Sequence, residues 1–162
     1  MSVVGEPYVE LNKPKDWIDS IDFSNPVTAL AKVAREFDGW APELTALITD
    51  GEAAPVPRYI YALPVKHTWD RVPGVTLLGD AAHLMIPSGE GANLAMFDGA
   101  ELGKAISANR GDVEAGLMAY EKNLFPRSAS EAADSEEVLK VCLGPNAPQS
   151  LLDFFTSHQP AK

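Results

Sequence analysis

Cysteine and long apolar runs are nearly absent from this sequence of 162 residues. Its single cysteine, Cys142, leaves no partner for an internal disulfide and is typical of a reducing compartment. No apolar run approaches the ~18 residues that a membrane-spanning helix needs. The first residues also lack the charged start and apolar stretch of a secretion signal. We therefore expect a soluble protein of the cytoplasm.

Concentrated positive charge is missing as well. The net charge is −10, and no basic patch is denser than "RVP" or "KVAR". This balance argues against nucleic acid or an anionic membrane as the main partner. The three histidines lie far apart, and no Cys/His spacing indicates a metal site.

The chain is long enough to bury roughly two thirds of its unfolded surface, which suffices for a core. Apolar periodicity, caps and stop signals divide it into strands and helices. Strands are predicted over residues 7–12, 59–63 and 75–78, the last of them buried on both faces. Helices are predicted over residues 24–39, from Pro42 to the turn at 50–51, over 90–107, over 112–142 with a kink near Pro126, and as a short amphipathic segment at 147–155. This mixture indicates an α/β fold.

The most informative stretch is "LLGDAAHLMIPSGEGAN", from Leu77 to Asn93. Asp80 ends a predicted strand at the sheet edge where open α/β folds bind ligands, so it is a candidate acceptor for ribityl or ribose hydroxyls. The Gly-Glu-Gly at 89–91 lets backbone approach a ligand closely, and the amides that open the next helix favour an anionic or electron-rich group. Asn93 can donate or accept beside that group. The alternative is that these residues supply only turn and capping chemistry.

This stretch resembles the carboxyl-terminal flavin motif of the class A flavoprotein monooxygenases, the aromatic-hydroxylase-like family. "GDAAHLM", Pro87 and "GEGANLAMFDGAEL" carry the likeness, which is nearest to the tetracycline-degrading branch and extends through "LPVKHTWDRVPGVTLLGDAAH" and into "SLLDFF". The resemblance implies FAD, with the acid on the ribityl chain, the proline beside the isoalloxazine and the helix start at the pyrimidine edge. The implied cofactor-binding residues are Gly79, Asp80, Pro87, Gly89, Glu90, Gly91, Ala92 and Asn93.

The family's other FAD motif is not found in this sequence. Its only G-x-G is at residues 89–91, which lies too late and lacks the third glycine of the dinucleotide fingerprint. The resemblance thus implies an α/β chain (an α+β fragment) equivalent to the carboxyl-terminal half of the fold. Residues 1–57 would end the substrate domain and its sheet, and residues 58–162 would supply the last strand and helices of the FAD domain. We expect weak FAD binding by the chain alone, and association with a second copy or a complementing amino-terminal half.

Two functions remain open at this point. The resemblance implies part of an FAD-dependent, NAD(P)H-using monooxygenase that hydroxylates an aromatic or polycyclic small molecule. The alternative is a truncated, non-catalytic remnant that acts as a dimerising or scaffold module without flavin. For His83 a packing or hydrogen-bonding role is favoured over a proton shuttle, and for Glu90 a role at the helix dipole is favoured over cofactor contact. No residue is assigned to catalysis itself.

Overall fold

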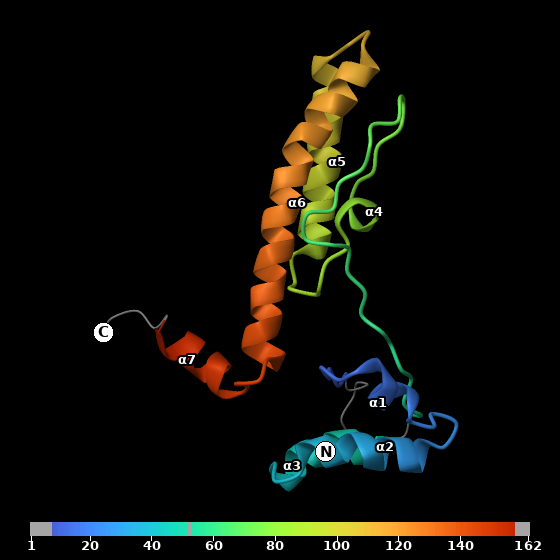
Figure 1. Ribbon diagram of the computed structural model, residues 1–162, viewed down its shortest axis with the longest axis vertical. Helices are drawn as coiled ribbons and strands as arrows, with labels where there is room; N and C mark the ends of the chain where they lie inside the picture. Colours follow the sequence, from blue (N-terminus) through green and yellow to red (C-terminus); the bar gives the residue numbers. More distant parts are fainter. Residues whose placement is uncertain (1–7, 52, 158–162) are drawn as a thin grey trace. The chain divides into compact units, whose positions relative to one another are not determined.

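The computed structural model describes residues 8–51 and 53–157. The chain divides into two compact units, Met1–Tyr59 and Ile60–Lys162. Helices are the regular secondary structure of both units in the described part of the chain (Figure 1). The assignment of residues 1–57 to a substrate domain and of 58–162 to an FAD domain stays a prediction.

Within residues 8–51 and 53–59, the first unit holds three α-helices and a short 3₁₀ helix. Helices α2 and α3 begin at the start signals that the sequence shows. Asn25 caps α2 by accepting a hydrogen bond from the Thr28 amide (3.3 Å), and proline occupies the first turn of α2 and of α3. The predicted helices at 24–39 and from Pro42 are therefore confirmed. The elements are α1 (Lys15–Asp19), α2 (Pro26–Ala34), η1 (Arg35–Phe37) and α3 (Pro42–Thr49).

The second unit is built on two long helices that pack side by side, α5 (Gly91–Ala108) and α6 (Val113–Leu143) (Figure 1). A short connection joins them, and Asp112 caps α6 by accepting from the Ala115 amide (3.0 Å). The core consists of Ala82, Tyr120 and Leu124. The predicted helices at 90–107 and 112–142 are thus confirmed, and α6 continues through Pro126.

Two further helices lie in the described part of this unit. A single turn, α4 (Asp80–His83), packs on α6, and α7 (Gln149–Ser157) follows the carboxyl end of α6. The short amphipathic segment predicted near residues 147–155 is therefore helical, as expected. Helix α4 sits in the stretch that the sequence singles out.

The predicted α/β fold is wrong, because residues 8–51 and 53–157 contain no strand. No strand is assigned in the described part of 7–12, in 59–63 or in 75–78, because a strand exists only where a neighbouring segment completes a ladder of backbone hydrogen bonds. Side chains hold the last segment instead: Tyr120 Oη donates to Leu77 O (3.3 Å). Val75 and Leu78 are 53% and 42% exposed, so this segment is not buried on both faces. Neither a substrate-domain sheet nor a last FAD-domain strand is present in these ranges.

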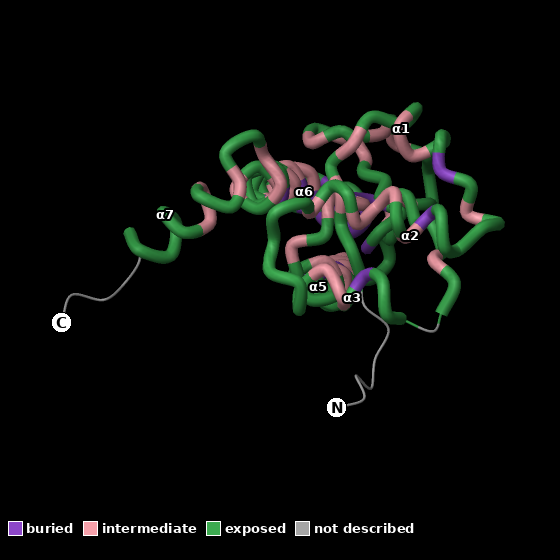
Figure 2. Tube along the Cα trace, turned by 90° about the horizontal axis from the view of Figure 1, so that it is seen from below, coloured by how far each residue is buried: buried purple, intermediate pink, exposed green. Residues whose placement is uncertain are grey.

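Buried residues are a minority, and several of them are polar. Most of the trace in Figure 2 is exposed or intermediate. The buried polar side chains of the second unit come from α4, α5 and α6, and they are His83, Asp98, Glu121, Ser128 and Ser135. Because burying an unpaired polar group is costly, the hydrogen bonds of His83, Asp98 and Glu121 are central to how the unit is held together.

Candidate functional site

A pocket of about 250 Å³ lies between α4 and the start of α5. It brings together five of the cofactor-binding residues predicted from the sequence: Asp80, Pro87, Gly89, Gly91 and Ala92. The remaining lining residues are His83, Met85, Ile86 and Ser88. The stretch from Asp80 to Ala92 therefore folds around one hollow.

Three predicted residues do not line this pocket. Gly79 is buried behind it, and its amide donates to Asp98 Oδ2 (3.0 Å). Glu90 is the exposed N-cap residue of α5, and its Oε2 accepts a hydrogen bond from Asn93 Nδ2 (3.1 Å). This bond joins two residues of the first turn, so Glu90 and Asn93 order the helix start. Glu90 thus lies at the N-cap position of α5, and its favoured role at the helix dipole stays a prediction.

The start of α5 presents unpaired backbone donors next to the pocket. The first α-helical bond runs from the Leu94 amide to Glu90 O (2.9 Å), so the amides of residues 91–93 precede it. Such amides carry the positive end of the helix dipole. A side chain added at Gly89 or Gly91 would meet no atom within 4 Å, which means that open space adjoins the backbone there. A flat, electron-rich group can therefore approach the backbone of the α5 start.

Asp80 supplies a hydrogen-bond acceptor to the pocket, whereas the start of α5 supplies donors. It is the first residue of α4, it is exposed and it lines the pocket. An ionised carboxylate only accepts hydrogen bonds, so it suits the hydroxyl groups of a sugar or of a sugar alcohol chain. The pocket thus combines an acceptor for hydroxyls with donors for an electron-rich group.

Sequence reasoning missed a buried ionic network behind the pocket. Asp98 of α5 is fully buried, and its Oδ2 lies 2.6 Å from His83 Nε2 while its Oδ1 accepts from Arg127 Nη2 (2.8 Å). His83 is 4% exposed, which agrees with the hydrogen-bonding role favoured for it. A usable signal was present: Asp98 stands one turn after the buried Leu94, on the stripe of α5 that packs inward.

A second buried carboxylate fixes the segment that precedes the pocket. Glu121 of α6 accepts hydrogen bonds from Trp69 Nε1 (3.1 Å), Arg71 Nη1 (3.1 Å) and Thr76 Oγ1 (2.7 Å). Arg71 also pairs with Glu114 (2.8 Å). Residues 69–76 are therefore tied to α6 by ion pairs and side-chain hydrogen bonds.

Comparison with known proteins shows similarity over this same region. Residues 65–132 match the family described as "FAD binding domain", and this range includes the whole pocket as well as Asp98 and Arg127. A dual O-methyltransferase/FAD-dependent monooxygenase, elcB of Phaeosphaeria nodorum, is 39% identical over 90 residues, which are 52% of this chain and 10% of that protein. The chain thus spans about a tenth of the length of this curated relative. Residues 65–132 are thus similar to FAD binding domains, and the relative similar to this chain is one named as an FAD-dependent monooxygenase.

Membrane-spanning helices and metal-binding clusters are both absent from the described residues. No helix there combines the length and apolar character needed to cross a membrane. Within the same ranges, no three His, Cys, Asp or Glu side chains come together as a metal site.

Proposed function

We propose that this chain forms the flavin-ring and ribityl end of the FAD site in an FAD-dependent monooxygenase. The observation that carries the proposal is the pocket itself. Residues of the flavin-like motif surround it, and it lies inside the segment that matches FAD binding domains. The proposed cofactor-binding residues are Gly79, Asp80, Pro87, Gly89, Glu90, Gly91, Ala92 and Asn93.

The pocket fits part of a dinucleotide rather than all of it. Its volume of about 250 Å³ lies below the ~300–1,000 Å³ typical of complete small-molecule sites. The open space beside Gly89 and Gly91 admits a flat ring to the backbone, which a side chain at either position would fill. Since the sequence holds no G-x-G-x-x-G turn for the adenosine half, the isoalloxazine and ribityl chain are the parts that fit here.

Each residue then has a role that follows from its chemistry. Asp80 accepts hydrogen bonds from ribityl hydroxyls. The family resemblance places Pro87, which lines the pocket, beside the isoalloxazine. The amides at 91–93 donate toward the pyrimidine edge, where the positive end of the α5 dipole favours negative charge. When bound, FAD supplies the redox chemistry that uses NAD(P)H and oxygen to hydroxylate a small molecule. The residues of this chain hold and orient the ring for that chemistry.

The finer parts of the proposal rest on the sequence. The motif and its flanking residues resemble the tetracycline-degrading branch most closely. That resemblance implies the use of NAD(P)H and an aromatic or polycyclic substrate. The exposed thiol of Cys142 supports a reducing, cytoplasmic setting. A second copy or a complementing amino-terminal half is the proposed protein partner.

The experiment that tests the proposal compares three ligands on the purified chain. Titrations with FAD, FMN and ADP are followed by flavin fluorescence and calorimetry. We expect FAD and FMN to bind with similar dissociation constants, both weaker than about 1 μM, because only the shared ring and ribityl chain make contacts. ADP should neither bind nor compete.

Two results would count against this assignment. Competition by ADP, or submicromolar FAD binding with no FMN binding, would place the adenosine half in the pocket. No binding of either flavin at millimolar concentration would favour the alternative, a dimerising or scaffold module without flavin.

A further inference from the structure

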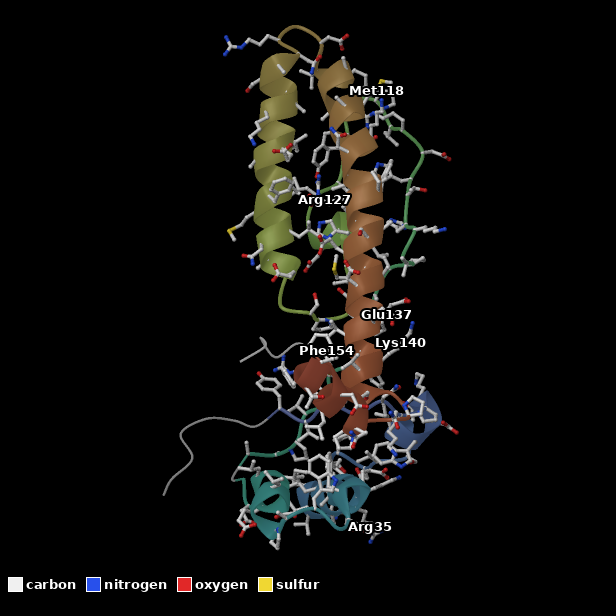
Figure 3. The ribbon with its side chains drawn as sticks, turned by 90° about the vertical axis from the view of Figure 1, so that its left-hand side faces the viewer. Arg35, Met118, Arg127, Glu137, Lys140 and Phe154 are labelled. Atoms are coloured by element: carbon white, nitrogen blue, oxygen red, sulfur yellow. The ribbon has the colours of Figure 1, made fainter. Side chains whose placement is uncertain are left out.

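Asp98 joins three parts of the second unit through one buried carboxylate. Its Oδ2 accepts from the Gly79 amide (3.0 Å) and lies 2.6 Å from His83 Nε2, and its Oδ1 accepts from Arg127 Nη2 (2.8 Å). Figure 3 shows Arg127 on the side of α6 that faces α5. Asp98 is 0% exposed and does not line the pocket, so any effect it has on a ligand passes through its neighbours.

The bond to Gly79 fixes the turn that places Asp80. Gly79 has φ +59° and ψ −144°, a backbone conformation that L side chains rarely adopt. A Cβ at this position would lie 3.2 Å from Ala95 Cβ, so the turn sits directly against α5. The Gly79 amide is buried with Asp98 as its acceptor, and an unpaired buried amide is costly. Loss of that acceptor therefore favours a different turn, which would move the carboxylate of Asp80.

The bond to His83 fixes a second wall of the pocket. The hydrogen bond between Asp98 Oδ2 and His83 Nε2 (2.6 Å) holds the imidazole ring, which lines the pocket, against α5. Arg127 balances the charge of Asp98, and its guanidinium lies 4.8 Å from the centre of the Phe97 ring. The arginine thus holds the buried carboxylate from the α6 side with an ion pair.

We infer that Asp98 is a positioning residue of the pocket. It holds the carboxylate of Asp80 in place through the Gly79 turn, and it holds the imidazole of His83 in place by a direct hydrogen bond. This inference rests on the proposed flavin site. Asp98 would thereby fix the distance between the hydrogen-bond acceptor at the start of α4, which is Asp80, and the backbone donors at the start of α5.

The test compares Asp98→Asn with Glu121→Gln. Glu121 is a matched control, because it is also a buried carboxylate with three donors, but none of its partners lines the pocket. Asp98→Asn should weaken FMN binding about tenfold and speed hydrogen exchange at the Gly79 amide. Glu121→Gln should lower the melting temperature while leaving both readouts within about twofold of the wild type. If Asp98→Asn does not fold, Arg127→Gln takes its place, with a smaller effect in the same direction.

A double-mutant cycle separates positioning from general support. If Asp98 acts through Asp80, Asp98→Asn should cost far less FMN affinity in the Asp80→Ala background than in the wild type. Additive losses, or Gly79 exchange equal to that of Glu121→Gln, would overturn the inference. Failure of the wild-type chain to bind FMN would overturn the proposed function instead. Gly79 exchange is measured without flavin, so it still decides whether Asp98 holds the turn.

Discussion

Asp80 is the pocket residue whose side chain offers the clearest contact to a ligand. It is exposed at the start of α4, so its removal should disturb the fold little. Asp80→Ala should weaken FMN binding roughly ten- to a hundredfold, because a hydrogen bond to a charged group contributes ~1.5–3 kcal/mol. Affinity is measured by fluorescence titration and stability by thermal melting.

The opposite pattern would assign Asp80 to the turn alone. In that case Asp80→Ala would lower stability by about 1 kcal/mol, as a lost cap does, and leave flavin affinity unchanged. Asp80→Asn is the matched control, since it keeps an acceptor oxygen and should retain part of the affinity.

Tyr120 makes stability depend on alkaline pH. Burial raises the pKa of its hydroxyl well above the usual 10.0, and the nearby charge of Asp98 adds to the rise. Above pH 10 the unfolded chain loses this proton first, which favours the unfolded state. The free energy of unfolding should therefore be undiminished by this group below pH 10 and should fall as the pH rises further.

Urea unfolding between pH 8 and 11 measures this effect against two variants. Tyr120→Phe should lose the alkaline fall and, at neutral pH, about 1 kcal/mol for the bond to Leu77 O. Tyr8→Phe, at an 80% exposed position, should keep the wild-type profile. An unchanged alkaline profile in Tyr120→Phe would show that another group is responsible.

The close approach of α5 and α6 depends on Gly116. A Cβ there would lie 3.0 Å from Ala105 O and 3.1 Å from Ile106 Cα, and these backbone atoms cannot rotate away. Gly116→Ala should therefore destabilise the chain by about 1–3 kcal/mol in urea unfolding, despite a helix-propensity gain of about 1 kcal/mol. Gly103→Ala, on α5 where nothing lies within 4 Å of the added Cβ, should instead stabilise it by up to about 1 kcal/mol. Equal effects of the two substitutions would disprove the packing argument.

At the scale of elements, helices α2, α3, α5, α6 and α7 were predicted from the sequence, whereas the short helices α1 and α4 were not, and the predicted strands are wrong. Asn25 with Pro26, and Asp112 before α6, act within a few residues of themselves, so the sequence shows them directly. A strand at 75–78 would depend on backbone partners elsewhere in the chain. Here side chains of α5 and α6 bind the backbone in and next to this segment instead: Tyr120 donates to Leu77 O, and Asp98 accepts from the Gly79 amide.

The candidate site likewise contains residues that the sequence locates and contacts that it does not show. The pocket residues from Asp80 to Ala92 form one continuous stretch, so a motif could locate them. Arg127 lies 29 residues from Asp98, and that ion pair exists only because α5 and α6 pack together. Periodicity places Asp98 on the inner face of its helix but does not name its partners.

For the molecule as a whole, exposed apolar side chains support self-association. Val75, Leu78, Met96 and Phe97 are all more than 40% exposed in the second unit. Apolar surface of this kind favours contact with another chain when it is contiguous. We predict a dimer or larger species in sedimentation velocity at micromolar concentration. A well-folded chain that stays strictly monomeric would contradict this.

The central claim is that the stretch from Asp80 to Asn93 binds the ring and ribityl end of a flavin. The most direct test is an NMR titration of the isotope-labelled chain with FMN, with backbone amides assigned. We predict that the amide signals of Asp80, Gly89, Gly91 and Ala92 shift with a common dissociation constant, while that of Gly103, near the far end of α5, does not. Unchanged signals throughout residues 80–93 at millimolar FMN, or shifts confined to other parts of the chain, would contradict it.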